Sequence, residues 1–102
     1  MQFYKNMYWG EKVKKPDKLK RKLRLGIGRL SFYIISLSKT EDQLDVFKAS
    51  QIKQKFFNKK ELKIVGIAWD YEDAINLVLA ITKDVYEKTQ GAAIKQYLEN
   101  DF

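Results

Sequence analysis

The fold is decided by residues 62–89, which read LKIVGIAWDYEDAINLVLAITKDVYEKT. The first eight of these residues are mostly apolar and rich in β-branched side chains, as in a strand that is covered on both faces. Asp70 then has the chemistry of a helix N-cap, and the two acids that follow it place negative charge in the first turn, where the helix dipole favours it. We therefore expect a strand over 62–69 that passes directly into a long helix.

Apolar residues recur along this helix at spacings of three and four until about Thr89, which is the pattern of a buried stripe. Leu77, Leu79 and Ala80 widen the stripe and predict deep burial. Gly91 is the expected C-cap, and a last short helix is expected over 92–99. The stripe consists of Ala74, Ile75, Val78, Ile81, Thr82, Val85 and Tyr86.

A second strand is expected over 32–38, FYIISLS, because this run is nearly continuously apolar and rich in aromatic and β-branched residues. Thr40 and Gln43 have the spacing of a capping box, which predicts a helix from Thr40 to about residue 58. Strand, helix and strand in this order predict a βαβ unit, in which the strands over 32–38 and 62–69 are parallel.

The N-terminal part of the chain is less clearly patterned. Leucines spaced by four residues predict a helix from Lys12 or Asp17 to Leu25, but alternating apolar residues over 19–27 also allow a strand. Residues 2–9, QFYKNMYW, are aromatic without clean alternation, and we expect an arm that packs on the domain or lies in the groove of a partner.

The expected architecture is a small single α/β domain over 1–102 with elements in the order α-β-α-β-α-α and a short parallel sheet covered by helices. It consists of an aromatic N-terminal arm (1–10), a basic segment (11–29) and a βαβ core followed by C-terminal helices (30–102). Two parallel strands leave two open edges. Either the arm adds a strand, or helices cover the edges, or two chains join as a homodimer.

Three stretches carry a resemblance to known sequences: FYIISLS, KKELKIVGIAWDYEDAINLV and DVYEKTQG. In these stretches the chain resembles a group of uncharacterised bacterial proteins of about 100 residues that share this order of elements. The resemblance covers most of residues 3–98. It implies the fold and a single domain, and it implies no activity or functional residue.

Positive charge is concentrated at one end of the chain. Residues 1–30 hold ten Lys/Arg against two acids, a net charge of +8, whereas residues 31–102 hold ten against eleven, a net charge of −1. The basic segment predicts contact with nucleic acid or another polyanion over 12–29, without base specificity because it lacks amide and aromatic side chains. An anionic membrane surface or a merely solvating face are the alternatives. The candidate contact residues are Lys12, Lys14, Lys15, Lys18, Lys20, Arg21, Lys22 and Arg24.

Hydroxyls lie at the end of the first predicted strand and carboxylates at the end of the second, where ligands of parallel sheets bind. If the strands are parallel, the two sets share one rim, where they could hold Mg²⁺ or divide the roles of general acid and general base. Capping and helix-dipole roles explain the same residues more simply, so we predict no metal or catalytic site. The two sets are Ser36, Ser38 and Thr40, and Asp70, Glu72 and Asp73.

Cysteine and histidine are both absent, which excludes disulfides, the common zinc sites and the usual catalytic triads. The sequence has no phosphate-binding glycine loop, and from the pattern of residues 1–15 we expect no secretory signal. We expect a non-enzymatic cytoplasmic binding or accessory protein with no cofactor and no small-molecule substrate. The alternative is a protein interaction module, or a homodimeric structural protein, with no role in nucleic-acid binding.

Overall fold

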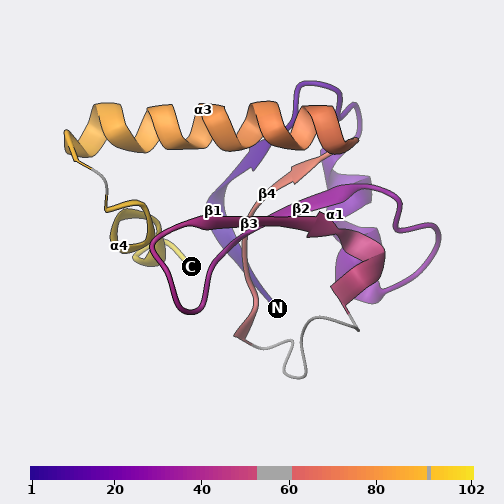
Figure 1. The fold of residues 1–102 in the computed structure, drawn as a ribbon. Helices are drawn as coiled ribbons and strands as arrows, with labels where there is room; N and C mark the ends of the chain where they lie inside the picture. The colour runs from indigo at the N-terminus through magenta and orange to yellow at the C-terminus, as the bar shows by residue number, and fades with distance from the viewer. Residues whose placement is uncertain (53–60, 92) are drawn as a thin grey trace.

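The structure is a computed structural model that describes residues 1–52, 61–91 and 93–102. It is an α/β domain in which helices cover both faces of a four-stranded mixed sheet (Figure 1). The strands lie in the order β1-β4-β2-β3. The elements are β1 (Gln2–Trp9), α1 (Pro16–Leu25), β2 (Tyr33–Leu37), β3 (Leu44–Lys48), the 3₁₀ turn η1 (Ala49–Gln51), β4 (Lys63–Ala68), α3 (Tyr71–Thr89) and α4 (Ile94–Glu99).

The predicted βαβ unit over 32–69 is wrong, because β2 is antiparallel to β4 and also to β3. Residues 44–48, expected in a helix, form β3 and return beside β2 as a hairpin. In the turn between β2 and β3, the hydroxyl of Ser38 accepts hydrogen bonds from the backbone N–H groups of Thr40 and Glu41. This hydrogen bonding satisfies the backbone in a turn rather than at a helix start. The remainder of the predicted helix, residues 53–58, lies outside the described residues.

The antiparallel arrangement also separates the two sets of polar residues that were expected to share a rim. Tyr33 at the start of β2 pairs with Ala68 at the end of β4. Ser36, Ser38 and Thr40 therefore lie toward the opposite end of the sheet from Asp70 and the acids that follow it. Over residues 1–52, 61–91 and 93–102, no three His, Cys, Asp or Glu side chains are grouped in a way that could hold a metal ion.

The aromatic arm is strand β1, which pairs in parallel with β4 at the edge of the sheet. Of the three solutions considered for the open sheet edges, this confirms that the arm adds a strand. The helical alternative for the basic segment is also confirmed, because residues 16–25 form α1. Gly26 follows as the C-cap, with a φ of 66° in the left-handed region that glycine adopts readily. The parallel pair of this fold is thus β1 and β4, with α1 in the connection.

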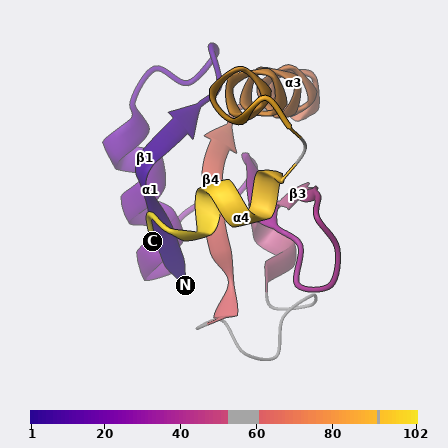
Figure 2. The ribbon, with the colours of Figure 1, turned by 90° about the vertical axis from the view of Figure 1, so that its left-hand side faces the viewer.

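Each face of the sheet has its own apolar core. Neighbouring residues of β2 point to opposite sides, so that Ile34 packs under α1 whereas Ile35 packs under α3. Figure 2 shows α1 on one side of the sheet and α3 with α4 on the other. Both cores are built from side chains that are almost fully enclosed, and this enclosure supplies most of the hydrophobic stabilisation.

The long helix is confirmed, but its buried stripe is narrower than predicted. The buried apolar residues are Ala74, Leu77, Ile81 and Val85, whereas Leu79 and Tyr86 are mostly exposed. The C-cap is Gln90, with φ of 58°, rather than Gly91. Residue 92, the expected start of the last helix, lies outside the described residues, and α4 begins at Ile94. Among the described helices, none combines the length and apolar character needed to cross a bilayer.

Candidate functional site

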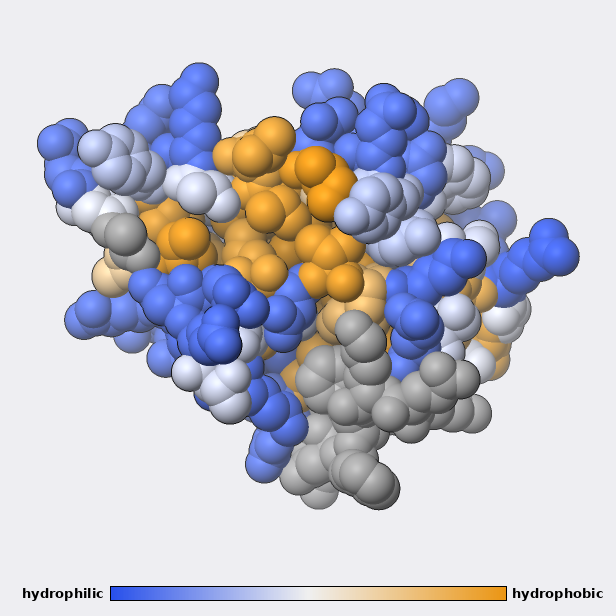
Figure 3. Space-filling model, viewed as in Figure 1, coloured by the Kyte–Doolittle hydropathy of each residue, from blue (hydrophilic) through white to orange (hydrophobic). Residues whose placement is uncertain are grey.

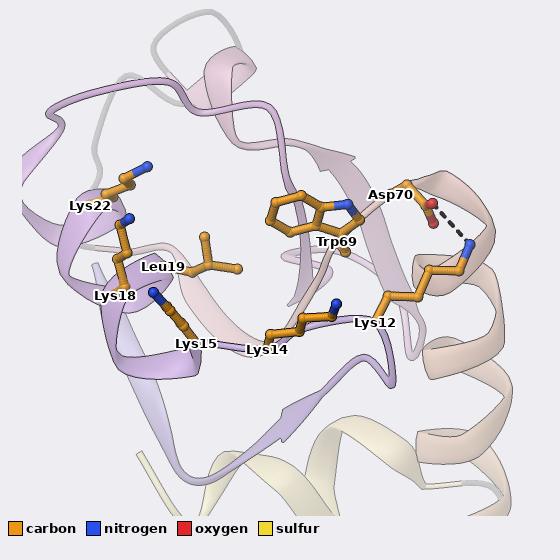
Figure 4. Close-up of a pocket in the computed structure, with 8 residues that line it drawn as sticks. All are labelled: Lys12, Lys14, Lys15, Lys18, Leu19, Lys22, Trp69 and Asp70. Atoms are coloured by element: carbon orange, nitrogen blue, oxygen red, sulfur yellow. Dashed lines mark hydrogen bonds and ion pairs between the residues drawn. The ribbon is translucent and has the colours of Figure 1, made fainter.

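A hollow of about 540 Å³ opens at the carboxyl ends of the two parallel strands (Figure 4). It lies between the segment 10–15 that follows β1, one face of α1, and the two residues that join β4 to α3. Ligands of α/β sheets typically bind at this edge, outside the carboxyl ends of parallel strands. The lining residues are Lys12, Lys14, Lys15, Lys18, Leu19, Lys22, Trp69 and Asp70.

Asp73 ties the two sides of the hollow together. Its side chain is almost fully buried, and its carboxylate accepts hydrogen bonds from the backbone N–H groups of Trp69, at 2.9 Å, and Lys12, at 3.3 Å. Gly10 packs directly against the same carboxylate, so closely that a Cβ atom at this position would overlap it. The sequence predicts only a helix-dipole role for Asp73. The structure adds the role of a buried anchor that holds the segment 10–15 beside the end of β4.

The positive charge of Lys12 is neutralised by acidic side chains of the domain itself. Its Nζ lies 2.9 Å from Asp70 Oδ2 and 3.7 Å from Glu72 Oε1. Asp70 is also the N-cap of α3, as predicted, and accepts from the N–H of Asp73. That hydrogen bond, followed by the one from Lys12, lowers the pKa of the Asp70 carboxyl, while the hydrogen bond to Asp70 raises the pKa of Lys12. Lys12 is therefore a structural ion-pair partner more than a free ligand group.

Four other lysines of the hollow are not neutralised in this way. Within the part of the chain that the structure describes, Lys14, Lys15, Lys18 and Lys22 make no ion pair with an acid. Lys18 and Lys22 are four residues apart on one face of α1, and Lys15, three residues before Lys18, lies beside the hollow on the same side (Figure 4). The side chain of Lys15, the N-cap residue, makes no capping hydrogen bond. The positive end of the helix dipole therefore adds to the lysine charges.

The other three predicted contact residues, Lys20, Arg21 and Arg24, do not line the hollow. Lys20 instead lies over the ring of Phe3, with its Nζ 5.0 Å from the ring centroid. The helical period explains the division, because these three positions are rotated away from the face that carries Lys18 and Lys22. The structure thus brings together five of the eight predicted residues.

Trp69 is the lining residue that the sequence did not reveal. It has 53% of its surface exposed, although an indole is large and apolar enough to favour burial. The sequence places it at the end of an apolar strand, and the basic segment itself has no aromatic side chain. Only the parallel pairing of β1 with β4 brings this ring beside the lysines. The sequence signal that could have pointed to Trp69 is an aromatic residue directly before a helix N-cap, at the end of a strand, where ligands bind.

No family model matches the chain, and no curated protein or solved structure matches it either. The resemblance to small bacterial proteins therefore stays a prediction, and the site itself is what bears on function.

Proposed function

We propose that this chain is a non-catalytic module that binds single-stranded nucleic acid without sequence preference in the hollow beside Trp69. The observation that carries this proposal is the placement of an exposed indole among four lysines that have no ion-pair partner in the described part of the chain. A positively charged groove that holds the phosphates and an aromatic ring that stacks with a base are the two parts of sequence-independent single-strand binding.

The division of labour follows from the chemistry of each group. Lys15, Lys18 and Lys22 would each neutralise a phosphate and release the counterions that surround it, which favours binding at low salt. Trp69 would stack with one base, and stacking discriminates little between bases because each base has a π face. The lining has no Asn, Gln or Arg that could read a base edge by a bidentate hydrogen bond.

The same geometry favours a single strand over a duplex or a membrane surface. In a duplex the bases are already stacked, so the indole would have no ring face to contact. Insertion into a membrane would need an apolar face on α1, yet Leu19 and Leu23 are buried against the sheet and only Leu25 among its leucines is exposed. The aromatic ring and the free lysines together therefore fit an unpaired strand best.

Removing the lysines of the hollow should abolish most of the salt dependence of binding. We expect the affinity of the wild type for a labelled single strand to fall about 50-fold between about 50 and 200 mM salt if four phosphates are contacted. With Lys15, Lys18 and Lys22 changed to Gln, the fall should be only about 3-fold. Fluorescence anisotropy over a salt series measures both values.

The matched control changes Lys20, Arg21 and Arg24 to Gln, which removes the same charge from outside the hollow. This variant should keep a slope of log affinity against log salt close to that of the wild type. Equal slopes for the two triple variants would show that binding responds to overall charge and not to the hollow. No binding by the wild type at low salt would rule the proposed function out.

Trp69 should contribute affinity that does not depend on salt. Trp69→Ala should weaken single-strand binding by about 1–3 kcal/mol, roughly 5-fold to 150-fold, because stacking on an aromatic ring is lost. The salt slope should not change, and binding to a duplex should weaken much less. In a Trp9→Phe background the indole at 69 is the sole tryptophan, so its fluorescence should be quenched as a strand binds. Unchanged fluorescence on saturation would contradict the stacking role.

A further inference from the structure

α3 carries an apolar stripe beside the residues that pack on the sheet, and the described part of the domain leaves this stripe exposed. Tyr71, Ile75, Leu79 and Tyr86 are 59%, 38%, 64% and 62% exposed. Their spacings of four, four and seven residues keep them on one side of the helix. Figure 3 shows hydrophobic side chains gathered in one continuous area that runs from α3 to the strand below it. That area is larger than singly scattered apolar residues would give.

The strand beside this stripe is β3, the outer strand of the sheet. In an antiparallel pair, residues point their backbone groups alternately toward and away from the neighbouring strand. Bonds from Ser38 N–H to the carbonyl of Gln43, and from Ala49 N–H to that of Phe32, fix this alternation. Leu44, Val46 and Lys48 therefore direct their backbone groups outward. The N–H of Lys48 binds the side chain of Gln51, whereas no strand of the described chain pairs with the outer edge of β3.

The open backbone positions and the apolar stripe lie on the same part of the molecule. Leu44 and Val46 pack their side chains against the core under α3, together with Tyr33 and Val78. The ring of Tyr33 also contacts that of Tyr71 edge-on, with centroids 5.8 Å apart. The edge of β3 and the stripe thus form one continuous surface, which combines unpaired strand hydrogen-bonding groups with exposed apolar side chains.

We propose that this surface binds a second copy of the same chain, with β3 paired antiparallel to β3 and α3 packed against α3. A two-fold axis through Val46 places this residue opposite its own copy and Leu44 opposite Lys48 of the second copy. The backbone groups of these residues point outward, so the pairing can form without moving β3 once the N–H of Lys48 exchanges the side chain of Gln51 for the carbonyl of Leu44 in the second copy. The same axis sets the two α3 helices antiparallel on one face of the joined sheet, which brings Tyr71 toward Tyr86 of the second copy.

Charge and area both favour a second copy as the occupant. Figure 2 shows α1 beside β1, at the edge of the sheet opposite to β3, so the two basic segments of a dimer would lie at its far ends. Partly exposed side chains of this size leave on the order of 400 Å² uncovered on the stripe. A stable interface buries about 800 Å² per partner. The stripe thus supplies about half of that area, and the edge of β3 must supply the remainder.

The test is the mass of the full chain in solution. Sedimentation equilibrium at up to about 200 µM should give twice the mass of the 12.1 kDa chain, since interfaces of this size have dissociation constants of micromolar or below. Leu79→Lys should raise the dissociation constant at least about 30-fold, because it places a charge at the centre of the interface. Leu25→Lys is the matched control, since Leu25 is 57% exposed on α1, and it should leave the constant unchanged.

Amide hydrogen exchange tests the strand pairing separately. The amides of Leu44 and Val46 should be protected in the wild type at high concentration and should exchange rapidly in Leu79→Lys. Leu79 is mostly exposed, so this variant should keep the circular dichroism of the wild type. A wild type that stays monomeric, a dimer that Leu79→Lys does not weaken, or a dimer in which both amides exchange rapidly would each overturn the proposal. None of these results depends on nucleic-acid binding.

Discussion

Gly10→Ala should lower the free energy of unfolding by about 3 kcal/mol or more, although it adds a single methyl group. The new Cβ would overlap the carboxylate of Asp73, which is almost fully buried and cannot turn out into water. Displacing this carboxylate would leave the N–H groups of Trp69 and Lys12 without their acceptor. Each buried donor that loses its partner costs about 1–3 kcal/mol.

Urea denaturation followed by circular dichroism measures this loss. The control is Gly91→Ala, because a Cβ at Gly91 would meet nothing closer than 3.8 Å and this residue has no positive φ. It should change stability by about 0.5 kcal/mol or less. The double variant Gly10→Ala/Asp73→Ala should lose clearly less stability than the sum of the losses in the two single variants, since both substitutions act on one contact. Strict additivity would show that Gly10 and Asp73 are not coupled.

Gly10→Ala should also affect the proposed binding site. Asp73 holds the segment 10–15 beside Trp69, so a displaced carboxylate would separate the lysines from the indole. Affinity for a single strand should therefore fall in Gly10→Ala even under conditions where the variant remains folded. Unchanged affinity would mean that the hollow does not depend on this anchor.

Much of the fold follows from local patterns in the sequence. The segments now assigned to α1, β2, β4 and α3 each have an apolar period and an end signal that agree with the observed element. Asp70 is one example, because a short polar side chain directly before a helical stripe rarely has another local role. These predictions succeed because each depends only on neighbours within the same element.

The wrong predictions are those that depend on how an element pairs with other parts of the chain. Thr40 and Gln43 have the spacing of a capping box, but the hydroxyl of Ser38 and the pairing of Leu44–Lys48 with β2 produce a hairpin instead. A five-residue edge strand carries little signal of its own, and its pairing partner decides it. The direction of β4 relative to β2 depends on this hairpin, and the local pattern of residues 40–58, which is that of a helix, therefore predicts the wrong direction.

The candidate site shows the same limit. The helical period of α1 is enough to place Lys15, Lys18 and Lys22 on one face, and this could have been predicted once a helix was chosen. The place of Trp69 beside these lysines could not be predicted in this way, because Trp69 is distant from them in the sequence. It reaches them only through the parallel pair of β1 and β4, in which Trp9 lies opposite Ile67. The aromatic half of the site therefore depends on topology alone.

Tyr4→Ala should remove about 3–5 kcal/mol of stability, as is usual when a buried aromatic side chain is truncated. Tyr4 is only 4% exposed, although it lies on an edge strand. Its ring stacks on Tyr8 at 5.8 Å between centroids and contacts Phe102 at 5.6 Å. The tyrosine thus joins β1 to the core under α3 and to the C-terminal end of the chain.

Urea denaturation of Tyr4→Phe provides the control, and this variant should stay within about 1 kcal/mol of the wild type because the buried ring is kept. In Tyr4→Ala, amides of β1 should exchange faster than those of β2, since β1 has lost its main contact with the core. Single-strand affinity should fall with it, because β1 leads directly into the segment that carries Lys12, Lys14 and Lys15. If Tyr4→Ala were as stable as the wild type, the ring of Tyr4 would not be the contact that fixes β1 to the core. The hollow would then have to be held in place by Asp73 alone.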